Sequence, residues 1–312
     1  PHISLKSSFF KTALVLGLLS AIGPFAIDMY LPALPSIGQS LGASMSAVQA
    51  SLMAFFISLG IGQIIYGPVS DMVGRKAPLY FGMVLFAVGS VGCALAPDIH
   101  TLVILRFIQG LGASAGMVIP RAVVRDLHTG HDAARIMSLL MLVFSVSPIL
   151  APLVGSLLIE AIGWRSVFWA VTVAAILGLI LIATSLPETR PPEERLGSSF
   201  GSALGGYWLL LRDKHFLGLV FIGAFGISSF FAYLANSSFV MIDHYGLTPR
   251  QYSIAFAANA ASFIGMSQLT GRLTGKFGLA PMVKVAVTCY AAIMIILLAV
   301  NLMGVDRLDV ML

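Results

Sequence analysis

Residues 67–76 read Gly-Pro-Val-Ser-Asp-Met-Val-Gly-Arg-Lys and join two apolar stretches, residues 46–70 and 78–96. Each stretch is long enough to cross a bilayer, because a transmembrane helix needs about 20 mostly apolar residues. A short basic connection between two such helices is typical of a loop that stays in the cytoplasm. This segment therefore indicates helices that cross a membrane and return.

The composition extends this interpretation to the whole chain. Of the 312 residues, 58% are hydrophobic and 10% charged, whereas soluble domains carry about 25% charged residues. The alternating pattern of a transmembrane β-barrel is absent, which leaves helices as the spanning elements. We expect an all-α polytopic membrane protein with about nine transmembrane helices, at residues 12–35, 46–70, 78–96, 101–124, 134–159, 167–186, 216–239, 251–273 and 281–303.

Basic residues are distributed unevenly between the two sides of this arrangement. An excess of Lys and Arg marks cytoplasmic loops, so the net charge of +5 reports orientation and does not indicate nucleic-acid binding. We expect a multi-pass protein with a cytoplasmic N-terminus. On that side lie thirteen basic residues, Lys6, Lys11, Arg75, Lys76, Arg125, Arg135, Arg190, Arg195, Arg212, Lys214, Arg272, Lys276 and Lys284, against three on the other, Arg165, Arg250 and Arg307.

One long polar connection, residues 187–214, divides the chain into six spans and three. It begins with Pro and Glu residues and continues through Gly- and Ser-rich sequence, a composition typical of a linker. We therefore expect an N-terminal six-helix bundle at residues 1–186, a cytoplasmic linker at 187–214 and an incomplete bundle of three helices at 215–312.

An internal repeat supports two related halves. Gly67, Asp71 and Gly74 correspond to Gly271, Gly275 and Gly278 with one offset of 204 residues. Parallel repeats of this kind are expected of a transporter made of two similar bundles. On this interpretation each half has six spans, and three of the second half are missing from the chain.

The loop resembles the signature G-x-x-x-D-x-x-G-R-K of the major facilitator superfamily. Three further stretches resemble the Bcr/CflA group of drug:proton antiporters: Asp-Met-Tyr-Leu-Pro from residue 28, Arg-Phe-Ile-Gln-Gly from residue 106 and Leu-Pro-Glu-Thr from residue 186. The resemblance implies two six-helix bundles in the bacterial inner membrane and export driven by a proton gradient without a cofactor. We expect a monomer. The signature is matched at Gly67, Asp71, Gly74, Arg75 and Lys76.

Asp28 and Arg106 lie inside apolar stretches, far from the loops. A charge in hydrocarbon costs at least about 2.5–3.5 kcal/mol, so such residues are functional candidates. At 1.5 Å per residue both lie about 7–11 Å below the outer surface. We expect Asp28 to be the proton-coupling carboxylate, for which protons compete with Arg106 or a cationic substrate. The alternative is a structural Asp28–Arg106 ion pair that closes the outer face.

Gln109 follows Arg106 by about one turn and can face the same cavity. It is expected either to donate to Asp28 or a substrate, or to join helices.

The signature loop is expected to have a separate role. Gly67 and Gly74 would permit a close approach and a tight turn, and Arg75 would pair with Asp71 or Asp126. The family resemblance implies a gate that pairs when the protein is open outward and breaks when it opens inward; a static turn clamp is the alternative.

The fifth stretch carries Pro148, Pro152 and Gly155 on one helical face. Prolines kink a helix and small residues let neighbours pack closely. This run resembles the antiporter motif G-P-x-x-G-G with two glycines replaced, which favours an exporter over an importer. A generic kinked packing helix is the alternative.

The sequence gives weaker signals for substrate contacts than for the charged residues above. Apolar and aromatic side chains with a few amides are the usual lining of a site for drug-sized molecules. The candidates are Tyr30, Gln109, Met141, Phe144, Tyr233 and Asn236.

Other classes of function fit less well. Residues 271–276 have one residue too few between their glycines for a phosphate-binding loop, and Phe277 stands where Ser or Thr is required. Neither a catalytic nucleophile and base nor a metal-ligating cluster is indicated, so no enzyme activity and no metal are expected. We expect efflux of small lipophilic drugs in exchange for protons. The alternative is an importer that moves a small metabolite together with protons.

Overall fold

The computed structural model describes residues 2–304, with the side chains of residues 2–10, 131, 134, 267, 268, 271, 272 and 279 left out. Lys6, Arg272 and Arg307, three of the charges that predict the orientation, lie outside these described side chains. So does Gly271 of the internal repeat.

Most of the described chain is helical. The first half contains α1 (His2–Asp28), η1 (Leu31–Ala33), α2 (Leu34–Leu41), α3 (Met45–Val73), α4 (Lys76–Leu95), α5 (Ile99–Leu127), α6 (Gly130–Ile162) and α7 (Arg165–Ser185). The connection contains η2 (Pro192–Arg195) and α8 (Phe200–Arg212). The second half contains α9 (Lys214–Ser238), the π-helical turn η3 (Phe239–His244), α10 (Pro249–Phe277) and α11 (Leu279–Leu302).

Eight helices of the described chain are long and apolar enough to cross a membrane. They correspond to the expected spans except residues 251–273, which form α10. That helix has the length of a span, with 29 residues, but polar side chains such as Asn259 and Ser262 lie along it and lower its hydropathy. The nine expected stretches are therefore nine long helices within residues 2–304, of which eight qualify by both length and composition.

Short polar side chains start several of these helices. Ser44 accepts the backbone N–H of Ala47 at 3.3 Å at the start of α3, and Asp98 accepts that of Thr101 at 2.9 Å at the start of α5. Such caps satisfy N–H groups that have no partner inside the helix. Because these residues stand between apolar stretches, the sequence itself marks where the spans begin.

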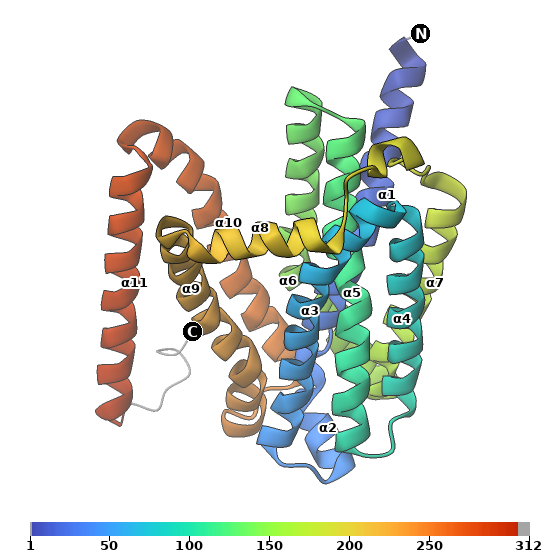
Figure 1. Cartoon of the computed structure of the whole chain (residues 1–312). Coiled ribbons are helices and arrows are strands. Elements are labelled where there is room, and N and C mark those ends of the chain that lie inside the picture. The colour runs from blue at the N-terminus through green and yellow to red at the C-terminus, as the bar shows by residue number, and fades with distance from the viewer. Residues whose placement is uncertain (1, 305–312) are drawn as a thin grey trace.

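The helices of the first half pack closely through small residues. A Cβ atom on Gly112 of α5 would lie 2.3 Å from the backbone nitrogen of Phe86 in α4, and one on Gly110 would lie 2.5 Å from the backbone oxygen of Phe55 in α3. Small residues at helix contacts are typical of membrane proteins, since they let backbones approach. Figure 1 shows these helices as one bundle, with α9, α10 and α11 beside it.

The two halves meet at the end of the molecule opposite the connection, which we call the far end. One hydrophobic cluster there contains Tyr30 of the first half together with Phe239 and Tyr252 of the second. The Gln49 side chain of α3 also donates to Asn236 Oδ1 of α9 at 2.9 Å. At the other end, which we call the linker end, the described parts of α9 and α10 are largely exposed. Within the described residues, these contacts between the halves lie at the far end.

The connection, drawn in yellow, crosses from the first bundle to the second as a helix (Figure 1). A reciprocal cap between Ser199 and Ser202 starts α8, and the Tyr207 hydroxyl donates to the backbone carbonyl of Ile64 in α3 at 2.8 Å. The region expected as a linker thus has its own secondary structure and contacts the first half.

Candidate functional site

Asp28 is the last residue of α1 and is buried where α1 packs against α6. Its Oδ2 atom accepts a hydrogen bond from Ser147 Oγ at 2.8 Å. Among the described side chains, no Lys or Arg forms an ion pair with Asp28. Asp28 is therefore a buried carboxylate that is hydrogen-bonded to a neutral hydroxyl group.

Arg106 of α5 is fully buried and stacks on aromatic rings. Its guanidinium carbon lies 4.2 Å from the ring centre of Tyr30 and 4.3 Å from that of Phe55. Such cation–π contacts contribute about 2 kcal/mol or more when desolvated. Because Arg106 is held between rings while Asp28 contacts α6, the ion pair between them that was considered as an alternative is not formed in this structure.

Gln109 joins helices. Its Oε1 atom accepts from Arg106 Nη1 at 2.6 Å, and its Nε2 atom donates to Ser90 Oγ of α4 at 2.8 Å. The Arg106 Nε and Nη2 atoms remain without a hydrogen-bond partner in the part of the chain that is described. Gln109 therefore orients Arg106 and holds α5 to α4, and it does not reach Asp28.

Arg75 is the centre of a second charged group at the linker end. Its Nε and Nη2 atoms donate to the two carboxylate oxygens of Asp126 at 2.7 and 3.2 Å. Its Nη1 atom donates to Asp71 Oδ1 at 2.6 Å and to Ser70 Oγ at 2.7 Å. Burial opposes the charge, but the two carboxylates raise the pKa of Arg75 above its usual value. Both expected acidic partners thus contact Arg75 at once.

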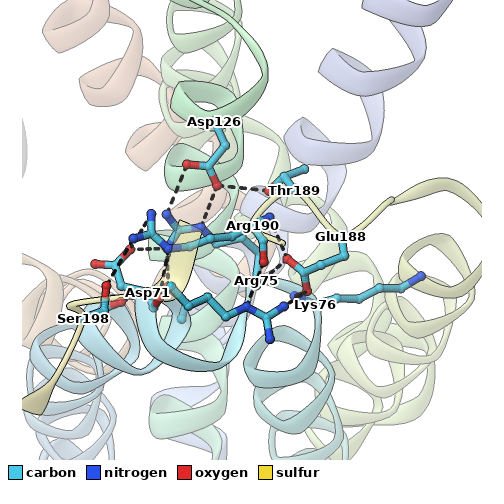
Figure 2. Close-up of polar contacts among 11 residues, drawn as sticks. Asp71, Arg75, Lys76, Asp126, Glu188, Thr189, Arg190 and Ser198 are labelled. Carbon is cyan, nitrogen blue, oxygen red and sulfur yellow. Dashed lines mark hydrogen bonds and ion pairs between the residues drawn. The ribbon is translucent and has the colours of Figure 1, made fainter. Parts of the chain in front are cut away.

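Glu188, which follows α7, completes this group (Figure 2). Its Oε1 accepts the backbone N–H of Arg75 at 2.9 Å and its Oε2 that of Lys76 at 3.1 Å. A carboxylate at these N–H groups is stabilising because they lie at the N-terminus of α4. The Thr189 hydroxyl donates to Asp126 Oδ2 at 3.0 Å. We call Asp71, Arg75, Asp126 and Glu188 the Arg75 cluster.

A second arginine ties the connection to α3. Arg190 Nε donates to the backbone carbonyl of Asp71 at 2.9 Å, and Arg190 Nη2 donates to Ser198 Oγ at 3.2 Å (Figure 2). All these partners belong to the first half or to the connection. The ion pairs of the Arg75 cluster thus form within the first half and the connection, and none of them involves a described side chain of the second half.

The two glycines of the signature, Gly67 and Gly74, have different surroundings in this structure. Gly74 has φ +97°, and a Cβ there would lie 2.6 Å from Glu188 Oε2. Gly67 lies inside α3 and has open space around it, with no described atom within 4 Å of a Cβ position. The expectation of a tight turn and close approach therefore holds for Gly74 and is wrong for Gly67, because α3 continues through that residue.

The proline-containing helix α6 contacts both halves. A Cβ on Gly155 would lie 2.5 Å from the backbone oxygen of Met29, so only glycine allows this approach of α6 to the chain after α1. The backbone oxygen of Pro152 accepts the hydroxyl of Ser253 in α10 at 2.8 Å. Pro148 lies within the same helix.

The substrate candidates are not brought together in one cavity. Tyr30 is buried, Met141 is exposed, and Phe144 carries Arg121 over its ring at 5.3 Å. Tyr233 stacks on another ring of the second half, and Asn236 is bonded to α3.

A hollow of about 480 Å³ lies elsewhere, between α1 and α7. Its lining is almost entirely apolar and includes Ile22, Phe25, Met29, Leu177 and Gly178. None of the six candidates lines it.

Several residues of these sites escaped prediction. Ser147, Glu188 and Arg190 owe their roles to partners more than 100 residues away. The acidic start of the connection between Pro187 and Pro191 was the available signal for Glu188, because prolines end α7 there. Within the described residues, no group of three His, Cys, Asp or Glu side chains is placed to hold a metal ion.

Buried charges between closely packed spans, with a charged loop at one end, define a polytopic helical membrane protein of the transporter type. The sequence matches the Major Facilitator Superfamily over residues 16–307. The chain belongs to this family of transporters.

Individual relatives agree with this placement. The chain is 42% identical over 277 residues to the uncharacterized MFS-type transporter YdgK of Bacillus subtilis, covering 88% of this chain and 69% of that protein. It is 30% identical over 281 residues to a bicyclomycin resistance protein homolog of Haemophilus influenzae, covering 90% and 71%. The latter places the chain with the Bcr/CflA group.

A solved structure shows the same fold. The xylose transporter XylE of Escherichia coli, in a partially occluded inward-open conformation, superposes with a TM-score of 0.64 at 19% identity and covers 88% of this chain and 74% of its own. At this identity the likeness concerns the fold alone.

Proposed function

We propose that this protein exports small lipophilic compounds across the bacterial inner membrane in exchange for protons. The observation that carries this proposal is the buried Asp28 carboxylate, which is hydrogen-bonded to Ser147 and ion-paired with no described side chain. A buried carboxylate without a cation is costly when ionised. It is therefore suited to take up a proton, and to give it up when a substrate contributes a positive charge or a donor.

The name of the bicyclomycin-resistance relative supports export of antimicrobial compounds. On this proposal the N-terminus and the Arg75 cluster are cytoplasmic, and the far end faces outward. The proton gradient drives transport, so neither a cofactor nor a metal takes part. The partners are the lipid bilayer, protons and the substrate, the protein acts as a monomer, and nucleic acid and enzyme chemistry have no role.

In this orientation the contacts of Gln49 with Asn236 and of Tyr30 with the second half lie at the outward end. The Arg75 cluster ties the connection to the first half. We propose that the cluster orders the connection, and that a moving part of the gate lies between α3 and the second half.

The proposal is tested in proteoliposomes that hold a preset pH gradient. Chloramphenicol, a small neutral lipophilic antibiotic, is added, and proton movement is followed with a pH-sensitive dye. Exchange predicts that the drug and protons cross in opposite directions and that Asp28→Asn abolishes drug-driven proton movement. Movement of both in the same direction would support a metabolite-type symporter.

A matched control is Glu160→Gln, which neutralises an exposed carboxylate of α6. This variant should exchange at the rate of the unaltered protein. The proposal would be overturned by Asp28→Asn protein that retains proton-driven exchange at that rate.

A further inference from the structure

Ser147 uses its hydroxyl differently from Ser145 and Ser156 of the same helix. A helical serine commonly donates to a carbonyl three or four residues before it. Ser145 Oγ donates to the Met141 carbonyl at 3.1 Å and Ser156 Oγ to the Leu153 carbonyl at 2.9 Å. Ser147 instead donates across the helix contact to Asp28 Oδ2 at 2.8 Å, and both side chains are buried.

The next residue supplies a second acceptor for the same hydroxyl. Pro148 lies inside α6 and has no N–H group, so the carbonyl of Phe144 lacks its usual donor four residues later. This carbonyl is three residues before Ser147, a spacing that a serine hydroxyl reaches. Ser147 can therefore donate either to Asp28 or within its own helix.

Few charged or titratable groups face Asp28 besides this hydroxyl. Helix α1 packs against α5, α6 and α7. Arg106 of α5 is bonded to Gln109 and stacked on rings. Tyr252 of α10 interacts with Asp28 electrostatically but bonds to Ser237. Helix α7 contributes Arg165 at its first residue, which bonds to another part of the chain, and the described residues of α6 place no charge against Asp28.

The same part of α6 also touches the second half. Five residues after Ser147, the Pro152 carbonyl accepts the hydroxyl of Ser253 in α10. Gly155 lies against the backbone of Met29, the neighbour of Asp28. A change of α6 at Ser147 is thus next to a contact between the halves.

We propose that Ser147 is a positioning residue that couples the protonation of Asp28 to a change in the hydrogen bonding of α6. The Pro152–Ser253 contact then carries this change from α6 to the second half. This inference rests on the proposed role of Asp28. With Asp28 ionised, Ser147 donates to the carboxylate. When Asp28 takes up a proton, its O–H donates to Ser147 Oγ, and the serine proton turns to the free Phe144 carbonyl. The one hydrogen bond of the ionised state is replaced by two, and only the proton on Asp28 is added.

The test compares the pH dependence of drug-driven proton exchange in full-chain proteoliposomes with chloramphenicol as probe. Ser147→Ala removes a hydrogen bond from both forms of Asp28, but the bond to the ionised carboxylate is the stronger of the two, so protonation becomes easier. The pH of half-maximal exchange should rise by about one unit, as expected for loss of one hydrogen bond to a charged group. Ser147→Thr keeps the hydroxyl and should have the midpoint of the unaltered protein. Ser147→Cys has a weaker donor, so its midpoint should lie between those of the unaltered protein and Ser147→Ala. The cysteine variant replaces the alanine variant in the test if the latter does not fold.

Ser145→Ala is the matched control, because it removes a hydroxyl of the same helix that bonds to its own backbone. Its midpoint should not move. Ser253→Ala should lower the rate of exchange without moving the midpoint, since it removes the bond to the Pro152 carbonyl and one to the Pro249 carbonyl of its own helix, and neither bond reaches Asp28. The proposal fails if Ser147→Ala and Ser147→Cys leave the midpoint unchanged, if Ser147→Thr shifts it as far as alanine does, or if Ser253→Ala exchanges at the normal rate. Retained exchange in Asp28→Asn would instead overturn the function itself.

Discussion

Arg75 and Asp126 form a two-point contact, with Nε–Oδ2 at 2.7 Å and Nη2–Oδ1 at 3.2 Å, that fastens the α3–α4 connection to the end of α5. The planar guanidinium matches both carboxylate oxygens, a geometry that a lysine does not reproduce. Arg75 is 4% exposed, so neither water nor a mobile side chain replaces the contact when it is lost.

Arg75→Lys should therefore destabilise the protein although the charge is kept. The variant loses the second hydrogen bond to Asp126, and we expect a loss of about 1–3 kcal/mol in the free energy of unfolding. The measurement is thermal unfolding of the detergent-solubilised protein, followed by fluorescence. Lys76→Gln is the neighbouring control, because the Lys76 ammonium lies over the Tyr80 ring at a distance of 5.9 Å. This variant should change stability by less than about 0.5 kcal/mol. Equal effects of the two variants would contradict this assignment.

Glu188 gives the Arg75 cluster a dependence on pH. Burial would raise the pKa of its carboxyl, but backbone N–H groups of Arg75, Arg190 and Lys76 and the charge of Arg195 lower it below the usual value. The stabilisation is then complete above the unfolded-state pKa of about 4.3 and is lost as pH falls through the lower folded-state pKa. The difference in Tm between the unaltered protein and Glu188→Gln should be constant near neutral pH and shrink below about pH 4. A Tm difference between the two proteins that grows as the pH falls would contradict this role of Glu188.

Gly74→Ala tests the close approach of the connection to the loop. Gly74 has φ 97° and ψ 166° and lies against Glu188, whereas Gly163 has φ 86° and ψ 172° with no described atom within 4 Å of its Cβ position. Both substitutions carry the same kind of backbone strain, but only Gly74→Ala adds a steric clash. It should cost about 1–3 kcal/mol more than Gly163→Ala. Trypsin should also cleave more readily after Arg195, and equal costs with unchanged cleavage would show that the approach is unimportant.

Gly155→Ala tests the contact of α6 with the chain after α1. The added Cβ would lie 2.5 Å from the Met29 backbone oxygen, so α6 must move away. Overpacking of this kind costs about 1–3 kcal/mol, and the displacement should also slow exchange because it separates Ser147 from Asp28. Gly223→Ala in α9 is the control, since its Cβ position is open. Normal stability and exchange in Gly155→Ala would refute the packing argument.

The sequence predicted the features that depend on local patterns. Apolar stretches of sufficient length predicted the long helices, and charges at their ends predicted which residues meet. Asp71 and Arg75 are four residues apart at a helix end, and Asp126 ends another span on the same side, so their contact with one another follows from spacing and topology.

The remaining features depend on contacts between segments distant in sequence. The Asp28–Ser147 hydrogen bond joins residues 119 positions apart, and hydropathy says nothing about which face of α6 meets α1. Equal depth suggested that Asp28 pairs with Arg106. The rotation of the two helices directs Arg106 to Tyr30 and Phe55 instead, and depth carries no information about rotation.

Proton release on substrate binding tests the role of Asp28 most directly. Chloramphenicol is added to the purified protein in weakly buffered solution, at a pH where exchange is active, and the change in pH is recorded. Competition between substrate and proton at Asp28 predicts release of protons from the unaltered protein and none from Asp28→Asn. Equal release from both proteins, or binding without release from the unaltered protein, would contradict proton exchange at Asp28.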